Sequence, residues 1–213
     1  MKVLAVVGTN RRNGLIVRLC SKILEGAKEN GHDTELVNLY DYKIGACMGC
    51  WACAEGSACI LKDDFPVVFE KVRTADVIVL ASPCYWGNVT GVMKNFFDRH
   101  TGCAMVGPKN ASSFSGMSFG KKAKILAAQL KSFGAPPEIA GKRFIIVTSM
   151  TVPFPVSHIS GDLRGVVGAM KIYVSNLKGR VISKIVYTDS LFRFLKKKER
   201  RYMRKARRIG NNL

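Results

Sequence analysis

The feature that most constrains this chain is the alternation of short apolar runs with longer segments of helical periodicity. Val3–Val7 and Val77–Ala81 are continuous in apolar residues, and glycine or proline follows each within two residues. Such runs are typical of parallel strands that are buried on both faces. By contrast, Leu15–Asn30 repeats its apolar residues at helical spacing and is followed by Gly31. The chain therefore begins with a strand and then a helix.

The same alternation continues along the chain. It predicts strands at Lys2–Val7, Thr34–Leu39, Val77–Ala81, Arg143–Thr148 and Val181–Thr188. It predicts helices at Leu15–Asn30, Asp64–Arg73, Thr90–His100, Lys121–Phe133, Leu163–Leu177 and Leu191–Ile209. Strands joined by crossover helices predict an α/β fold, a flavodoxin-like doubly wound sheet of five parallel strands in the order 2-1-3-4-5 with helices on both faces. We expect residues 1–213 to form a single flavodoxin-like domain.

Three segments stand out from this minimal plan. Residues 101–141 are long for a helix-to-strand connection, and we interpret them as an insertion that covers a site or makes an oligomer contact. Residues 44–62 form a cysteine-rich loop, and residues 191–210 a basic C-terminal helix. The apolar stripe of that helix favours docking on the sheet with a solvated cationic face.

The charge is strongly positive and uneven. The net charge is +19, and Arg193–Arg208 holds ten Lys/Arg and one Glu. This balance favours an acidic partner, such as a small acidic redox protein, an anionic cofactor, nucleic acid or a membrane surface, and does not choose among them. We expect no specific nucleic-acid binding. The long uncharged stretches contain Pro and Gly, so no membrane span is predicted. No export signal is recognised at Met1, and we expect a cytoplasmic protein.

Ligands of such sheets bind beyond the carboxyl ends of the strands, which directs attention to the loop Gly8–Gly14. Backbone N–H groups at a helix start, with two arginines nearby, suit a phosphate group. The residues alone leave this interpretation and an ordinary strand-to-helix turn equally open. The candidate binding residues here are Thr9, Asn10, Arg11, Asn13, Gly14, Leu15 and Ile16.

The loop after the third strand carries two adjacent aromatic residues. Rings at this position can flank a flat heteroaromatic ligand, while an amide and backbone groups bond its polar edge. The alternative is a turn whose aromatic rings pack into the core. The candidates in this loop are Pro83, Cys84, Tyr85, Trp86, Gly87 and Asn88.

Four of the seven cysteines lie within thirteen positions: Cys47, Cys50, Cys53 and Cys59. Four thiolates at this spacing can ligate one [4Fe–4S] cluster, and the first three match the opening of the bacterial ferredoxin motif. Zinc is the second possibility, although structural zinc sites usually split their ligands into two pairs. A redox-active dithiol is the third. These alternatives remain open from the residues alone.

Two histidines are not assigned a catalytic or ligand-binding role. His100 ends a predicted helix, where a positive charge interacts favourably with the helix dipole. His158 lies in a loop after the fourth strand and is expected to be solvated.

Three segments together resemble the NADPH-dependent FMN reductase family. They are Gly8-Thr9-Asn10-Arg11, the C-x2-C-x2-C-x5-C run followed by Lys62-Asp63-Asp64, and Ser82–Val89 through Phe97-Asp98-Arg99. Within that family, the cysteine spacing is similar to that of archaeal-type iron–sulfur flavoproteins. Leu15 and Ile16 depart from the family, which usually has Asn-Thr at the start of the first helix.

The resemblance implies FMN with its phosphate in the first loop and its ring near residues 83–88. It also implies a [4Fe–4S] cluster on the four clustered cysteines, ferredoxin or NAD(P)H as electron donor, and a homodimer or homotetramer. The function indicated is FMN-dependent electron transfer between donor, cluster and flavin, without a catalytic acid or base. The alternatives are an NAD(P)H-dependent FMN or quinone reductase without a cluster, and a flavin-free binding module.

Overall fold

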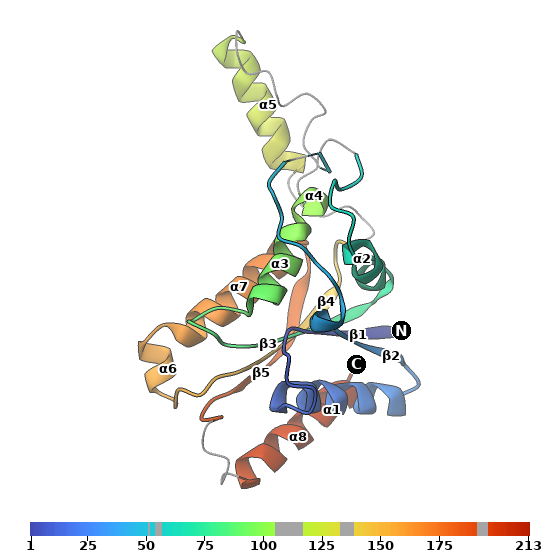
Figure 1. Cartoon of the computed structure of the whole chain (residues 1–213), viewed down its shortest axis with the longest axis vertical. Coiled ribbons are helices and arrows are strands. Elements are labelled where there is room, and N and C mark those ends of the chain that lie inside the picture. The colour runs from blue at the N-terminus through green and yellow to red at the C-terminus, as the bar shows by residue number, and fades with distance from the viewer. Residues whose placement is uncertain (51, 54–56, 105–116, 133–138, 191–195) are drawn as a thin grey trace.

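The protein folds around a five-stranded sheet in which each strand runs parallel to its neighbours. The computed structural model describes residues 1–50, 52–53, 57–104, 117–132, 139–190 and 196–213. The strands are β1 (Lys2–Val7), β2 (Asp33–Asn38), β3 (Val77–Pro83), β4 (Arg143–Ser149) and β5 (Arg180–Tyr187). Their order is β2-β1-β3-β4-β5, which confirms the predicted flavodoxin-like topology (Figure 1).

The central strands are buried on both faces. Val3–Val7 of β1, Val77–Ala81 of β3 and Phe144–Val147 of β4 are all 0% exposed. The outer strand β5 alternates between more and less exposed positions, whereas β2 is exposed or partly exposed from Asp33 to Leu36 and buried at Val37 and Asn38. The continuous apolar runs of the sequence therefore mark the strands that helices cover from both sides.

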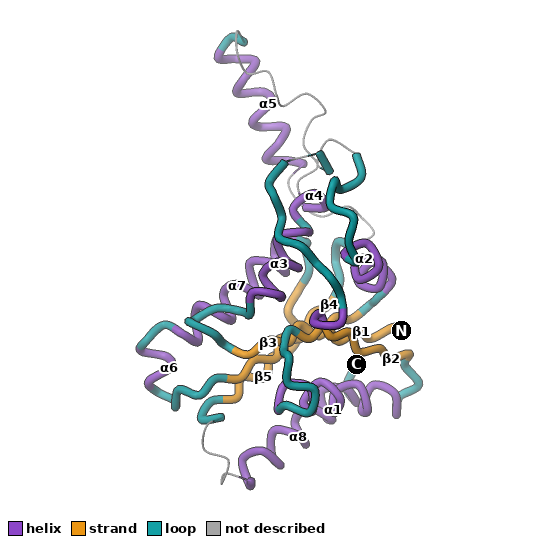
Figure 2. Tube along the Cα trace, in the orientation of Figure 1, coloured by secondary structure: helices purple, strands orange, loops and turns teal. Residues whose placement is uncertain are grey.

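Two layers of helices enclose the sheet (Figure 2). The long helices are α1 (Leu15–Glu29), α2 (Phe65–Thr74), α3 (Gly91–Arg99), α5 (Phe119–Ser132), α7 (Asp162–Asn176) and α8 (Lys196–Asn211). The short ones are η1 (Leu39–Asp41), α4 (Thr101–Ala104) and α6 (Val156–Ile159). Helices α1 and α8 cover one face, and α2, α3 and α7 cover the other. In the described ranges, no helix has both the length and the apolar character needed to cross a membrane.

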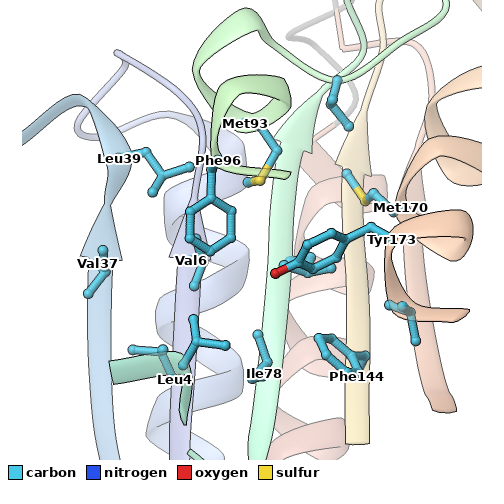
Figure 3. Close-up of a cluster of buried hydrophobic side chains, with 14 of the residues drawn as sticks. Leu4, Val6, Val37, Leu39, Ile78, Met93, Phe96, Phe144, Met170 and Tyr173 are labelled. Carbon is cyan, nitrogen blue, oxygen red and sulfur yellow. The ribbon is translucent and has the colours of Figure 1, made fainter. Parts of the chain in front are cut away.

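Each face of the sheet contributes to its own core. On the α2, α3 and α7 side, Val6 and Ile78 of the sheet pack with Phe96, Met170 and other buried side chains (Figure 3). On the opposite side, odd-numbered β1 residues pack with α1 and α8. The period-two alternation of strand side chains thus divides the apolar residues between two layers.

Helices α1 and α8 run parallel and very close together. A Cβ atom at Gly210 would collide with the backbone oxygen of Ile23, so the absence of a side chain at this position permits the contact. Near the carboxyl ends of the helices, Arg207 Nη2 lies 2.6 Å from Glu29 Oε1. Both helices therefore begin at the same edge of the sheet, the carboxyl edge.

The predicted insertion contains α4 and α5 in its described part. Helix α5 projects away from the sheet, at the opposite end of the molecule from α8 (Figure 1). Residues 105–116 and 133–138 lie outside the described residues, so the extent and role of 101–141 stay predictions. The first residues of the predicted basic helix, 191–195, also lie outside them.

The role expected for His100 is wrong. Its side chain is buried, and edge contacts surround it with the rings of Phe65, Phe96 and Tyr173. Its Nδ1 lies 2.7 Å from Phe96 O, which fixes that nitrogen as the donor. Burial lowers the pKa of His100 to about 4. The imidazole is therefore neutral at physiological pH and carries no charge to the helix end.

Because His100 is buried in its neutral form, we expect the folded protein to lose stability in mild acid. The unfolded chain protonates His100 near pH 6.5, whereas the folded protein does so only near pH 4. Between these values the free energy of unfolding should fall by up to about 1.4 kcal/mol per pH unit through this group. Urea denaturation from pH 7 to pH 4 measures this slope, and His100→Leu should flatten it. A slope unchanged by the substitution would contradict the assignment.

Candidate functional site

A cavity of about 1130 Å³ lies at the carboxyl edge of the sheet. Segments far apart in the sequence build its walls: the β1–α1 loop, the ends of β3, β4 and β5, and one side of α8. The residues that line it are Thr9, Arg11, Asn13, Gly14, Leu15, Ile16, Arg18, Pro83, Cys84, Tyr85, Ser149, Met150, Thr151, Tyr187, Ser190, Lys197, Glu199, Arg200, Met203 and Arg204.

The β1–α1 loop is fixed to the start of α3. Gly8 N donates to Ala81 O at 2.8 Å, and Thr90 Oγ1 donates to Gly8 O at 2.8 Å. A Cβ atom at Gly8 would lie 2.9 Å from Thr90 Oγ1 and 3.0 Å from Met93 Cβ. Glycine therefore allows this close approach, which positions Thr9 and the following residues at the cavity.

The start of α1 presents backbone donors to the cavity. Its N-cap is Gly14, which has no side chain to accept from the first-turn N–H groups. Ile16 is buried in the core below and Leu15 packs beside it, so neither fills the cavity. Arg12 instead pairs with Asp41, and its hydrogen bond lowers the pKa of that carboxyl group. Arg11 is exposed and lines the cavity.

The loop after β3 forms a tight reversed turn. Tyr85 and Asn88 exchange backbone hydrogen bonds of 2.9 and 3.0 Å, while Trp86 and Gly87 have φ values of 51° and 70°. Positive φ at both central residues defines a type I′ turn. A Cβ at Gly165 of α7 would collide with Gly87 O, so the turn rests directly on that helix. The Trp86 side chain is consequently 103% exposed and faces solvent.

Cys84 lies at the inner end of this loop as a neutral thiol. Its Sγ is 3.7 Å from Asp162 O, and burial raises its pKa above the ordinary value. The thiol form favours packing against a ligand over attack on it or coordination of a metal ion.

The structure brings nine of the thirteen predicted binding residues into the cavity wall. These are Thr9, Arg11, Asn13, Gly14, Leu15, Ile16, Pro83, Cys84 and Tyr85. The other four, Asn10, Trp86, Gly87 and Asn88, are outside its lining.

The sequence interpretation missed the wall that α8 contributes. It treated the cationic side of this helix as solvated, whereas Lys197, Arg200 and Arg204 line the cavity. The sequence signal that could have indicated this wall is the concentration of ten Lys/Arg residues in Arg193–Arg208. Ser149 and Thr151, at the end of β4, were not selected either.

The four clustered cysteines lie in an irregular loop outside this cavity. Cys47 and Cys50 are exposed, and Cys53 and Cys59 are partly exposed. Across the residues that the structure describes, no three His, Cys, Asp or Glu side chains are grouped to hold a metal ion. The number and type of donors fit a four-thiolate centre, but their described positions do not gather them around one point.

Arg99 anchors both ends of the cysteine loop. This side chain is only 1% exposed and forms an ion pair with Asp63, with Nη2 at 3.1 Å from Asp63 Oδ1. It also donates to Gly45 O at 3.3 Å and to Cys59 Sγ at 3.4 Å. Burial alone would raise the pKa of Asp63, but hydrogen bonds from Arg99 and from the backbone lower it. Cys59 is thus held beside a buried positive charge.

The fold and cavity together define a flavodoxin-like α/β protein with an open cavity at the carboxyl edge of its sheet. Residues 1–134 match the NADPH-dependent FMN reductase family model. Since this match covers more than half of the chain, the chain belongs to that family.

Curated relatives agree with this assignment, and solved structures share the fold. An iron–sulfur flavoprotein of Archaeoglobus fulgidus is 48% identical over 100 residues, which are 46% of this chain and 48% of that protein. An iron–sulfur flavoprotein of Methanosarcina thermophila is 34% identical over 99 residues, 46% of this chain and 52% of that protein. The matches thus span about half the length of these relatives. The NAD(P)H:quinone oxidoreductase from Methanothermobacter marburgensis has a similar fold, with a TM-score of 0.68, 17% identity, and coverage of 100% of this chain and 96% of that one.

The buried Arg99–Asp63 pair predicts a large difference between two Asp→Asn substitutions. Asp63→Asn leaves the Arg99 charge buried without its counter-charge, and should lower the free energy of unfolding by about 3 kcal/mol. Asp98→Asn breaks the exposed Lys94–Asp98 pair and should cost about 0.5 kcal/mol or less. Urea denaturation of both variants measures the difference, and equal effects would contradict the role of the buried pair.

The left-handed backbone at Trp86 predicts a stabilising substitution. A bulky residue with φ of 51° is strained, whereas asparagine tolerates this conformation. Because the ring is fully exposed, Trp86→Asn should raise the free energy of unfolding by about 1 kcal/mol. Trp86→Ala removes the same ring but lacks the side-chain amide, whose local hydrogen bonds let asparagine tolerate the left-handed conformation. The alanine variant should therefore show no such gain in urea denaturation; an equal gain would point to the ring as the cause.

Proposed function

We propose that the cavity binds FMN and that the protein is an FMN-dependent oxidoreductase of the iron–sulfur flavoprotein type. The observation that carries the proposal is the open cavity between the start of α1 and the turn after β3. Leu15 and Ile16 pack below it and Trp86 lies outside it, so none of the three occludes it.

The two ends of the cavity suit the two ends of FMN. The first-turn N–H groups of α1, with Arg11 beside them, offer donors and positive charge to a phosphate. Pro83 and Tyr85 offer flat apolar surfaces to a ring system, and Tyr85 is half exposed at the rim. Thr9 and Ser149 add hydroxyl groups between these ends.

FMN bound here would supply chemistry that accepts an electron pair and returns single electrons. The residues of this chain would orient the ring and limit its contact with water. Cys84 stays a neutral thiol, and no side chain is assigned as a catalytic acid or base.

The proposal includes a [4Fe–4S] cluster held by Cys47, Cys50, Cys53 and Cys59. Its support is the number and spacing of the thiols and the name iron–sulfur flavoprotein that similar proteins carry. Ligation requires the loop to close inward from its described arrangement. Since Arg99 holds Cys59 in place, Cys47, Cys50 and Cys53 would have to move toward Cys59.

The physiological context belongs to the same proposal. Ferredoxin or NAD(P)H would donate electrons, and a net charge of +19 favours an acidic donor protein. A homodimer or homotetramer and a cytoplasmic location complete it.

An anaerobic preparation tests the proposed function directly. We expect about one FMN, four irons and four acid-labile sulfides per chain, the content that one flavin and one [4Fe–4S] cluster require. Flavin without iron would support the cluster-free FMN or quinone reductase, and bound zinc would replace the cluster assignment. A colourless protein that fails to quench the fluorescence of added FMN would overturn the flavin proposal.

A tyrosine pair tests the ring end of the site. Tyr85→Ala removes a ring at the rim of the cavity and should weaken FMN affinity about tenfold, measured by fluorescence quenching. Tyr40→Ala removes a comparably exposed ring away from the cavity and should leave the affinity unchanged. Equal effects of the two substitutions would contradict ring binding at Tyr85.

A further inference from the structure

The cavity wall formed by α8 is strongly cationic. Five Lys/Arg side chains and one Glu line the cavity: Arg11, Arg18, Lys197, Arg200, Arg204 and Glu199. Arg18 and Glu199 form an ion pair and neutralise each other. Four positive charges therefore face one cavity, and within the described ranges none of the four is in an ion pair.

The positions of these charges on α8 follow helical spacing. Lys197, Arg200 and Arg204 are separated by three and four residues, which places them on one face of the helix. The parallel packing of α8 on α1, with the Arg18–Glu199 pair near the start of both helices, turns this face toward the cavity. The other side of α8 packs on α1 through Ala206.

This arrangement is unfavourable without an anion. Like charges at neighbouring positions repel each other, and cations near the start of a helix oppose its dipole. The first turn of α1 on the adjoining wall consists of Leu15, Ile16 and Val17, which offer backbone N–H groups but no polar side chain. A phosphate there receives hydrogen bonds from the backbone and needs countercharge from elsewhere.

We propose that Lys197, Arg200 and Arg204 of α8 bind the phosphate group of the flavin, opposite the backbone donors of α1. This inference rests on the proposed function, because it assumes that FMN occupies the cavity. It gives the basic helix a role in binding: α8 supplies the positive charge that the β1–α1 loop provides only through Arg11. Arginine suits this role because its planar guanidinium can bond two phosphate oxygens at once.

Two double substitutions on α8 test the inference. Arg200→Gln with Arg204→Gln removes two charges from the cavity wall. Arg201→Gln with Arg208→Gln removes two exposed charges of the same helix that are outside the wall. The affinities of both variants and the wild type are measured for FMN, for NADPH, and for riboflavin, which has the same ring as FMN but no phosphate.

We expect the cavity variant to bind FMN about 100-fold more weakly, since each charged hydrogen bond contributes about tenfold. Its riboflavin affinity should equal that of the wild type, and the control variant should match the wild type for both ligands. Loss of riboflavin binding in the cavity variant would reveal a structural effect and overturn the inference.

The remaining outcomes separate this inference from the proposed function. Wild-type protein that binds neither flavin overturns both. Unchanged FMN affinity in the cavity variant overturns only the role of α8 in phosphate binding. If that variant instead loses affinity for NADPH alone, the cations serve a dinucleotide, and the assignment to FMN is wrong.

Discussion

The burial of three parallel strands between two helix layers is the constraint on which the rest of the structure depends. Because β1, β3 and β4 are covered on both faces, polar and flexible residues are confined to their ends. The parallel direction of the strands gathers their carboxyl ends at one edge, where the β1, β3 and β4 loops meet. The cavity is thus a consequence of the sheet, and individual side chains determine only what it can bind.

The sequence alone predicts the order of the five strands and the two cavity walls formed by the loops after β1 and β3. Apolar runs reveal central strands, and parallel topology implies that the loops after Val7 and Pro83 converge. The outward direction of Trp86 was not accessible, because it depends on the contact between Gly87 and Gly165. The neutral state of His100 depends likewise on its burial among aromatic rings from three helices. Its position at the end of a helix instead predicts a positively charged side chain.

The α8 wall was hidden for a related reason. An amphipathic basic helix has the same pattern whether its cations face water or a ligand, and only its direction relative to α1 decides between them. That direction depends on the close contact of Gly210 with the backbone of α1. For the cysteine loop the spacing of the four thiols predicts joint ligation, which stays a prediction, whereas the contacts of Arg99 with Gly45 and Cys59 come from the fold and could not be read from the sequence.

The place of α8 in the chain has a consequence for biosynthesis. Residues 196–211 form one wall of a cavity whose other walls come from the ends of β1, β3, β4 and β5. The part of a nascent chain that precedes α8 therefore contains all five strands but lacks this wall. The ribosome must release this helix before the cavity is complete. A ligand that needs all of these walls can therefore bind only after this region has been translated.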